Sequence, residues 1–397
     1  MENDRGFFNL LLSRILRSVG LIYASLASPL YLSALGLNPA VIGVIFFGVI
    51  GFTAGLSLLL GYLGDRFGYK KSLIIGDLFP LIGLIMLGLA SKINLIIPAL
   101  IITGISGNAG AARGAFSPGL TALVVSNWKD EKERVSRMGT LFSAAGFAGV
   151  GGSLMISAIK FIPLPTVTSY RILFEVSAVL LAFSVANLVY VKEEKREKKT
   201  TKFITRSSAN YISRVIISNA VTGFGLGLSI PLLTLWFKVF YHASPFDIGI
   251  IFTSGSICSA LGSLVATRIK GNPLKLAYIT RIVNGVLLVA MGLSPYMVLA
   301  GALYSIRAIN AGIGLPNRNV TNIRGVSAED YGSASSLQGV VTRVSQMSSG
   351  ISGYLLEDFP GLPLELGGLL QALGGYLYMY LLSKRAEPPQ VKKEIPP

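Results

Sequence analysis

Apolar stretches of about 20 residues recur along almost the whole chain. Each is long enough to cross a hydrocarbon core of about 30 Å as an α-helix. The composition agrees, because 52% of the 397 residues are hydrophobic and only 14% are charged, whereas soluble proteins carry about 25% charged residues. The stretches do not alternate polar and apolar residues, as the strands of a membrane barrel do. The sequence therefore predicts an all-α integral membrane protein.

Twelve transmembrane helices are expected from these stretches. Their predicted ranges are 13–36, 39–62, 72–91, 94–127, 137–160, 169–191, 209–237, 246–269, 274–293, 296–322, 332–357 and 362–383. The charged run KEEKREKKTTKFITR falls midway along the chain and is typical of a solvated linker. The expected organisation is an N-terminal six-helix bundle over residues 1–191, a cytoplasmic linker over 192–206, a C-terminal six-helix bundle over 207–383 and a cytoplasmic tail over 384–397.

The distribution of lysine and arginine predicts the orientation. One set of connections, together with both chain ends, carries 23 of the 35 basic residues. The connections on the opposite side carry four, which are Lys92, Lys160, Arg171 and Lys238. Cytoplasmic loops are enriched in Lys and Arg, so both termini are expected in the cytoplasm. The expected location of the protein is the plasma membrane. Because the charge is dispersed over separate loops, it does not indicate a nucleic-acid partner.

The two halves of the chain resemble each other. The segment SRILRSVGLIYASLASPLYL has a counterpart in SRVIISNAVTGFGLGLSIPLLTL about 200 residues later. Pro39 and Gly43 of NPAVIG likewise correspond to Pro245 and Gly249 of SPFDIG. Two similar bundles can rock against each other around a site at their interface. This motion exposes one site alternately to the two sides of a membrane.

The loop GYLGDRFGYKK, residues 61–71, carries a more specific pattern. Its order of Gly, Leu, Asp, Arg, Gly and two lysines resembles the motif between the second and third helices of the major facilitator superfamily. YRILFEVSAVL (170–180) and WKDEKERVSRMG (128–139) are similar to that family's entry to helix six and its loop after helix four. The equivalent loop of the second half, TRIKGNPLK, lacks the aspartate. The resemblance covers the whole chain and implies a secondary transporter.

The resemblance also implies a role for this loop. Asp65 and Arg66 would form a cytoplasmic latch that meets a basic group or a helix N-terminus when the transporter faces outward. The partners to test are Arg134 and the start of the helix near Tyr331. The candidate latch residues are Gly61, Asp65, Arg66, Gly68 and Arg134. Because its counterpart is missing from the second half, the latch is expected on one side only.

Eight arginines fall inside the predicted spans. An ionised side chain there costs at least about 2.5–3.5 kcal/mol. Four of them are expected to extend toward the headgroups, namely Arg14, Arg214, Arg281 and Arg318. Arg113, Arg307 and Arg343 lie deeper, and Arg17 is intermediate. Such residues face a wet cavity or pair with an acid, and the sequence offers too few acids to pair them all.

These deep arginines have two interpretations. Guanidinium groups bind anions through bidentate hydrogen bonds, and the resemblance places helices 1, 4, 7 and 10 around a central cavity. Equally, the arginines could bond backbone carbonyls at glycine-rich stretches of helices 4 and 10. Polar neighbours favour the cavity somewhat. The candidate solute-binding residues are Arg17, Tyr23, Asn108, Arg113, Asn219, Arg307, Asn310 and Arg343.

Proton coupling needs a carboxylate whose pKa burial can raise. No Asp or Glu lies in predicted helices 1, 4, 7 or 10. Asp77 and Glu175 are the remaining coupling candidates, although Arg171, one turn before Glu175, suggests a local ion pair for that residue. Facilitated diffusion and anion exchange therefore fit as well as proton-driven transport.

Other chemistries find little support in the sequence. One histidine, His242, and one cysteine, Cys258, supply neither a metal cluster nor a catalytic pair, so no enzyme, metal or cofactor is expected. The P-loop pattern is absent. The expected partners are a small solute, protons or a counter-anion, and membrane lipids, with the chain acting as a monomer. The alternatives to an anion or organic-solute transporter are a proton-driven exporter of hydrophobic compounds and, more remotely, a non-transporting receptor.

Overall fold

The computed structural model describes residues 2–105, 119–120, 123–124, 127–128, 130–193, 206–266, 268–269, 271–326 and 331–383. Helices account for most of these residues. The N-terminal helices are α1 (Glu2–Ala34), α2 (Pro39–Phe67), α3 (Tyr69–Leu89), α4 (Ile93–Thr103), α6 (Glu131–Ala158) with a 3-10 turn at Ile159–Phe161, and α7 (Thr166–Val189). The C-terminal helices are α8 (Arg206–Ser229), α9 (Leu233–Tyr241), α10 (Pro245–Ala266), α11 (Pro273–Gly292), α12 (Met297–Ile323), α13 (Tyr331–Gln346), α14 (Ser349–Asp358) and α15 (Leu362–Ser383).

The helix boundaries follow local capping chemistry. α2 begins at Pro39 after Asn38, whose side chain accepts a hydrogen bond from the amide of Val41. α11 begins at Pro273 after Asn272, which accepts from the amide of Leu274. Asparagine at the N-cap and proline at the first helical position satisfy or remove donors that would otherwise lack a partner. The connections before both helices are therefore encoded locally.

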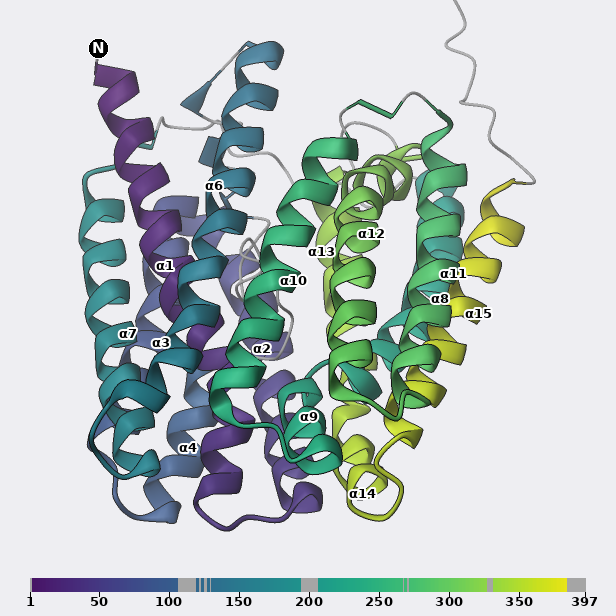
Figure 1. The fold of residues 1–397 in the computed structure, drawn as a ribbon. Helices are drawn as coiled ribbons and strands as arrows, with labels where there is room; N and C mark the ends of the chain where they lie inside the picture. Colours follow the sequence, from purple (N-terminus) through teal and green to yellow (C-terminus); the bar gives the residue numbers. More distant parts are fainter. Residues whose placement is uncertain are drawn as a thin grey trace, which may run out of the picture.

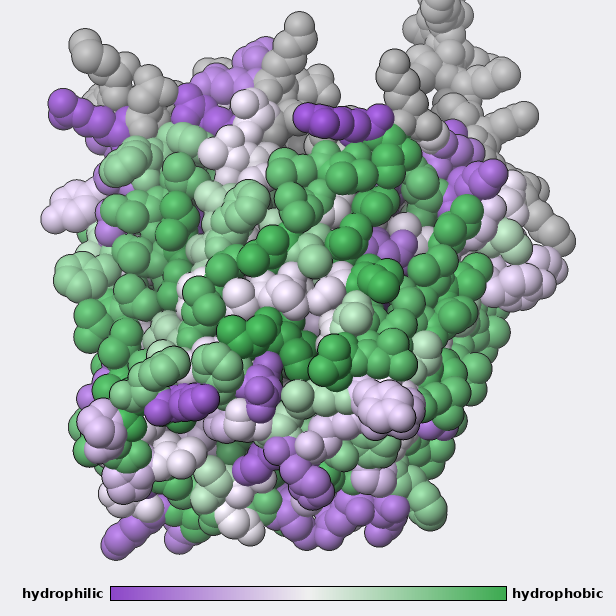
Figure 2. Space-filling model, viewed as in Figure 1, coloured by the Kyte–Doolittle hydropathy of each residue, from purple (hydrophilic) through white to green (hydrophobic). Residues whose placement is uncertain are grey.

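Nine of the described helices are long and apolar enough to cross a membrane. They are α1, α2, α3, α6, α7, α8, α10, α11 and α12. α4 is a shorter apolar helix, and two predicted spans are divided, into α8 and α9 and into α13 and α14. An all-helical membrane protein is thus confirmed, while the count of twelve spans remains a prediction. Apolar residues dominate the middle of the surface in Figure 2 and hydrophilic residues its two ends, as contact with lipid requires.

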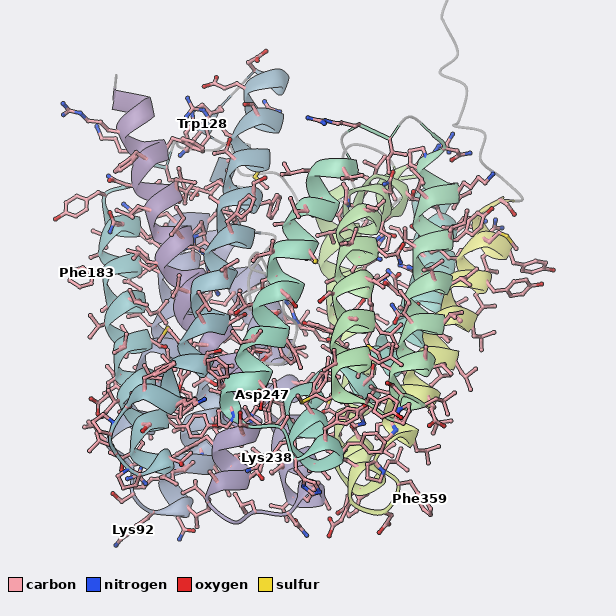
Figure 3. All side chains as sticks on the ribbon, viewed as in Figure 1. Lys92, Trp128, Phe183, Lys238, Asp247 and Phe359 are labelled. Atoms are coloured by element: carbon pink, nitrogen blue, oxygen red, sulfur yellow. The ribbon has the colours of Figure 1, made fainter. Side chains whose placement is uncertain are left out.

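The chain passes repeatedly between two ends of the molecule (Figure 1). α1 begins at the upper end in that view, and α9 and α14 lie at the lower end. Trp128 lies at the upper end in Figure 3, whereas Lys92 and Lys238 lie at the lower end. The two lysines therefore share the end opposite the start of α1, as the charge pattern predicts. Which end faces the cytoplasm remains a prediction.

The helices pack closely at small residues. Between α1 and α6, a Cβ at Gly152 would stand 3.0 Å from the backbone nitrogen of Tyr23. Between α8 and α15, Gly225 and Gly367 each lie against the other's backbone carbonyl. Close backbone approach at small residues is the usual means of helix association in membranes. In Figure 1 the N-terminal helices group at the left and the C-terminal helices at the right.

Two helix pairs join these groups near the lower end. α2 meets α14 where Gly43 and Gly353 are in backbone contact, and α6 meets α10 where Ser157 packs on Gly249. Polar contacts accompany them, because Glu357 of α14 accepts hydrogen bonds from Asn38 Nδ2 and from the amide of Ala40, both at 3.3 Å. These residues hold the two groups together at that end.

Lys238 of α9 adds another contact between the groups. Its Nζ donates to Ser33 Oγ of α1 at 3.0 Å. Burial lowers the pKa of this lysine below its ordinary value, because desolvation disfavours the ammonium form.

Candidate solute-binding site

A buried ion cluster joins α1 to α3. Asp77 lies between two arginines, with Arg17 Nε at 2.7 Å from Oδ1 and an Arg14 terminal nitrogen at 3.0 Å from Oδ2. The three side chains are 8% exposed or less. The expectation that Arg14 reaches the headgroups is wrong, because an acid from a neighbouring helix pairs with it inside the fold. Of the candidate residues, Arg17 and Asp77 are thus brought together, and each satisfies the other.

A related cluster joins α8, α11 and α15. The two terminal nitrogens of Arg281 donate to Ser218 Oγ at 2.9 Å and to Asn219 Oδ1 at 2.6 Å. Its guanidinium stacks over the ring of Tyr378 at 4.1 Å from the centroid. Arg281 is 4% exposed, so the expectation that it reaches the headgroups is also wrong. Within the described ranges no carboxylate pairs with it.

Arg307 of α12 differs from these arginines. It is 9% exposed, yet its guanidinium forms no hydrogen bond or ion pair with any side chain or carbonyl of the described residues. Its Nε is fully enclosed and without a partner in that part of the chain. Buried cations normally have an anion or several acceptors around them. Arg307 is therefore a largely buried charge without a hydrogen-bonded countercharge among the described residues.

Asn310 lies one turn from Arg307 on α12, and its side chain contacts α11. Its Nδ2 donates to the backbone oxygen of Thr280 at 2.8 Å and to Asn284 Oδ1 at 3.0 Å, both on α11. An amide nitrogen has two hydrogens to donate, and both are used here. The amide donors of Asn310 therefore hold α12 to α11.

Arg343 spans the N-terminal and C-terminal groups. A terminal nitrogen of this α13 residue donates to Ser57 Oγ of α2 at 2.6 Å. Tyr23, in contrast, is fully enclosed among the N-terminal helices, where its hydroxyl donates to the backbone oxygen of Tyr170 at 3.2 Å and its ring meets Phe174 edge-on. Asn108 and Arg113 lie outside the described residues.

The candidate latch residues are spread over two connections. Gly61 and Arg66 lie in the last turns of α2, where Arg66 donates to the hydroxyl of Tyr62 at 2.9 Å. Arg134, on α6, donates through Nε to the backbone oxygen of Trp128. The predicted contact of Asp65 with Arg134 or with the helix start near Tyr331 stays a prediction, because the side chains of Asp65 and Tyr331 lie outside the described part of the chain.

Gly68 separates α2 from α3, and its environment reveals a residue that the sequence did not single out. The Glu193 carboxylate accepts from the amides of Tyr69 at 2.7 Å and Lys70 at 3.0 Å. Gly68 has φ +105°, and a Cβ there would meet a Glu193 oxygen at 2.8 Å. Glu193 thus caps α3, a helix with no side-chain cap at its own N-cap residue. A helix start directly after Gly68, which has no side chain to act as a cap, is the sequence signal that could have indicated a capping residue from elsewhere.

Glu175 is exposed on α7 and lies against Gly88 of α3. The predicted ion pair with Arg171 is wrong, because no salt bridge joins these two described residues and Arg171 Nε donates instead to the hydroxyl of Tyr31 at 3.1 Å. Among the described residues, no group of three His, Cys, Asp or Glu side chains could hold a metal ion.

Comparisons with known proteins agree with this architecture. The family model for the Major Facilitator Superfamily matches residues 7–351. No curated protein sequence matches the chain at a significant level.

Solved structures share the fold at low sequence identity. A D-xylose–proton symporter is 14% identical with a TM-score of 0.76, over 96% of this chain and 98% of that one. The nucleoside transporter NupG is 13% identical with a TM-score of 0.70, over 95% and 99%. The human organic anion transporter MFSD10 (TETRAN) is 12% identical with a TM-score of 0.64, over 95% and 99%. The family match along most of its length shows that this chain belongs to the Major Facilitator Superfamily.

Proposed function

We propose that this protein is a secondary active or facilitative transporter that moves a small organic anion by alternating access, with Arg307 binding the anion. Members of the family with this fold carry different solutes, since the neighbours' names include a sugar, nucleosides and organic anions. The fold therefore does not identify the solute. The proposal rests on the side chains of this chain.

The supporting observation is the buried guanidinium of Arg307 without a partner among the described residues. Arg17 already has a carboxylate at 2.7 Å, and Arg281 has two oxygen acceptors and an aromatic face. Arg307 has neither kind of partner there. A carboxylate or phosphate of the solute would supply the missing countercharge. The planar guanidinium of Arg307 can donate two parallel hydrogen bonds to either group.

The remaining candidates keep narrower proposed roles. Arg113 and Asn108 are proposed to line the solute path on the predicted fourth span. Arg343 is proposed to respond to the relative movement of α2 and α13, because its contact with Ser57 joins the two groups. Tyr23 and Asn310 are proposed to support the site by packing, since their described hydrogen bonds are made within the protein.

Two acids, Asp77 and Glu175, are the candidates for coupling transport to protons. Protonating Asp77 would remove the charge that two buried arginines share, so proton coupling through this residue would be costly. Glu175 is the other candidate acid. Uniport, exchange against a counter-anion and proton coupling are all compatible with the proposal. We place the protein in the plasma membrane as a monomer, with cytoplasmic termini, two six-helix bundles and the Asp65 latch at the cytoplasmic face.

A thermal-shift screen on the purified protein tests the proposal. Matched solutes share a carbon skeleton and differ in charge: succinate against succinamide, benzoate against benzamide and benzylamine, and phenyl phosphate against phenol. We expect anions alone to raise the unfolding temperature. Arg307→Gln is expected to abolish this shift, and Arg307→Lys to weaken it by about tenfold in affinity, because an ammonium cannot bind both oxygens as the guanidinium fork does.

Arg268→Gln is the matched control, because Arg268 is an exposed arginine in the connection between α10 and α11. Stabilisation by benzylamine or by the neutral solutes instead of the anions would contradict the proposal and favour the exporter of hydrophobic compounds. Uptake into liposomes with and without a pH gradient then separates proton coupling from uniport or exchange. Binding without any uptake would identify a receptor.

A further inference from the structure

The contact between Arg281 and Asn219 fixes the direction of an amide group. A guanidinium has only donors, so the atom of Asn219 that faces it at 2.6 Å must be the carbonyl oxygen Oδ1. The usual ambiguity between amide oxygen and nitrogen is thereby removed on chemical grounds. It follows that Nδ2 of Asn219 points away from Arg281.

Nδ2 of Asn219 has no acceptor among the described residues, although Asn219 is only 7% exposed. Its side chain has one hydrogen bond in that part of the chain, the one that Arg281 donates to Oδ1. Nδ2 is not among the fully enclosed polar atoms that lack a partner, so it keeps some access to solvent, and an oxygen ligand can reach it as a hydrogen-bond acceptor.

We propose that Arg281 is a positioning residue, which holds Asn219 so that its NH₂ donates to an oxygen of the transported anion. This inference rests on the proposed function and deepens it. Asn219 of α8 and Arg307 of α12 then both present only donors to the solute. Such a pair selects oxyanions, with carboxylate or phosphate groups, and gives no acceptor for amines. Arg281 itself would not touch the solute.

The aspartate variant of Asn219 distinguishes the role of the amide oxygen from the role of the amide nitrogen. Asn219→Asp keeps an oxygen facing Arg281 but replaces the outward NH₂ donor with an acceptor. We expect the ligand-free protein to unfold at the wild-type temperature or above it, since the new charge pairs with Arg281. We expect the dissociation constant for the best-stabilising anion among succinate, benzoate and phenyl phosphate to rise about tenfold or more, because a charge-assisted hydrogen bond becomes a repulsion.

Two variants at the same cluster show whether Arg281 acts through Asn219. Arg281→Gln is expected to raise KM or the dissociation constant, because a glutamine can hydrogen-bond to either the oxygen or the nitrogen of Asn219 and no longer fixes the direction of its amide. The maximal uptake rate should be kept. Adding Arg281→Gln to Asn219→Asp should cost no further affinity, since both changes act on one donor. Ser218→Ala removes the other oxygen partner of Arg281 and should leave affinity within about twofold.

The possible results discriminate clearly. Wild-type affinity in Asn219→Asp overturns this inference and leaves the anion transporter standing. Strictly additive losses in the double variant also overturn the positioning role of Arg281. If no anion in the series raises the unfolding temperature of the wild-type protein, the proposed function itself fails. The wild-type screen alone gives this result, so it is distinguishable from the results with the variants.

Discussion

At the scale of single residues, the arginines fall into distinct electrostatic environments. Arg14 and Arg17 share a carboxylate, and Arg281 has neutral acceptors and a ring. Arg307 has no hydrogen bond or ion pair among the described residues, where Tyr304 is its electrostatic neighbour. Burial is similar for all of them. What differs among these arginines is therefore the set of acceptors around each guanidinium, and burial alone does not tell them apart.

Asp77→Asn tests the structural interpretation of the first cluster. Removing the charge leaves two buried guanidiniums without an anion, so we expect the unfolding free energy to fall by about 3–5 kcal/mol. Thermal or denaturant unfolding in detergent measures this loss. Asp247→Asn is the control, since Asp247 accepts hydrogen bonds from Ser244 at the start of α10 and an asparagine can do the same. Unchanged stability in Asp77→Asn, with loss of pH-dependent uptake, would instead identify Asp77 as the coupling acid.

At the scale of helices, glycines decide how closely neighbours pack. Gly225 of α8 lies against the backbone of Gly367 on α15, and any Cβ there would overlap it. A Cβ added at Gly55 of α2 would have no atom within 4 Å. The two residues have the same helical conformation, so intrinsic helix propensity affects them equally.

We therefore predict opposite effects of alanine at these two positions. Gly225→Ala should lower the unfolding free energy by about 1–3 kcal/mol, because the added methyl separates α8 from α15. Gly55→Ala should leave stability unchanged or raise it by up to about 1 kcal/mol through helix propensity. Thermal unfolding of the two variants in one detergent measures the difference. Equal destabilisation would show that packing between α8 and α15 does not depend on Gly225.

At the scale of the whole molecule, the close contact at Gly43–Gly353 joins α2 to α14, which lies at the lower end in Figure 1. The contact at Gly249–Ser157 joins α10 to α6 two residues from Asp247, which Figure 3 labels in the lower part of the molecule. They join the N-terminal to the C-terminal helices. In an alternating-access cycle these contacts must separate whenever the site opens to that end. A contact that exists in only one state changes populations when it is altered, whereas one that exists in all states changes stability.

Gly249→Ala tests this distinction. The added methyl would meet Ser157 only while the lower end is closed, so a cost of about 1–3 kcal/mol shifts the population toward the state open at that end by roughly 5- to 150-fold. Spin-label distances across the lower end, between α2 and α14, should lengthen while the unfolding temperature changes less than in Gly225→Ala. Unaltered distances with a matching loss of stability would mean that α6 and α10 stay in contact throughout.

Local patterns predicted the fold class and the family. Twenty-residue apolar stretches leave few structures other than membrane helices, because every backbone group must be satisfied within the bilayer. The motif at residues 61–71 and the starts of α2 and α11 are encoded by consecutive residues, as are their caps. Such features depend on spacing along the chain and can be read from it.

Only the tertiary structure decided the partner of each polar side chain. The pairs Arg14–Asp77 and Asn38–Glu357 are separated by 63 and 319 residues, and Glu193 meets the start of α3 across 124. Sequence spacing carries no information on which helix lies opposite which. Hydropathy alone therefore predicted that the arginines lie in the membrane, while helix packing determined that Asp77 compensates two of them and that Arg307 has no hydrogen bond or ion pair among the described residues.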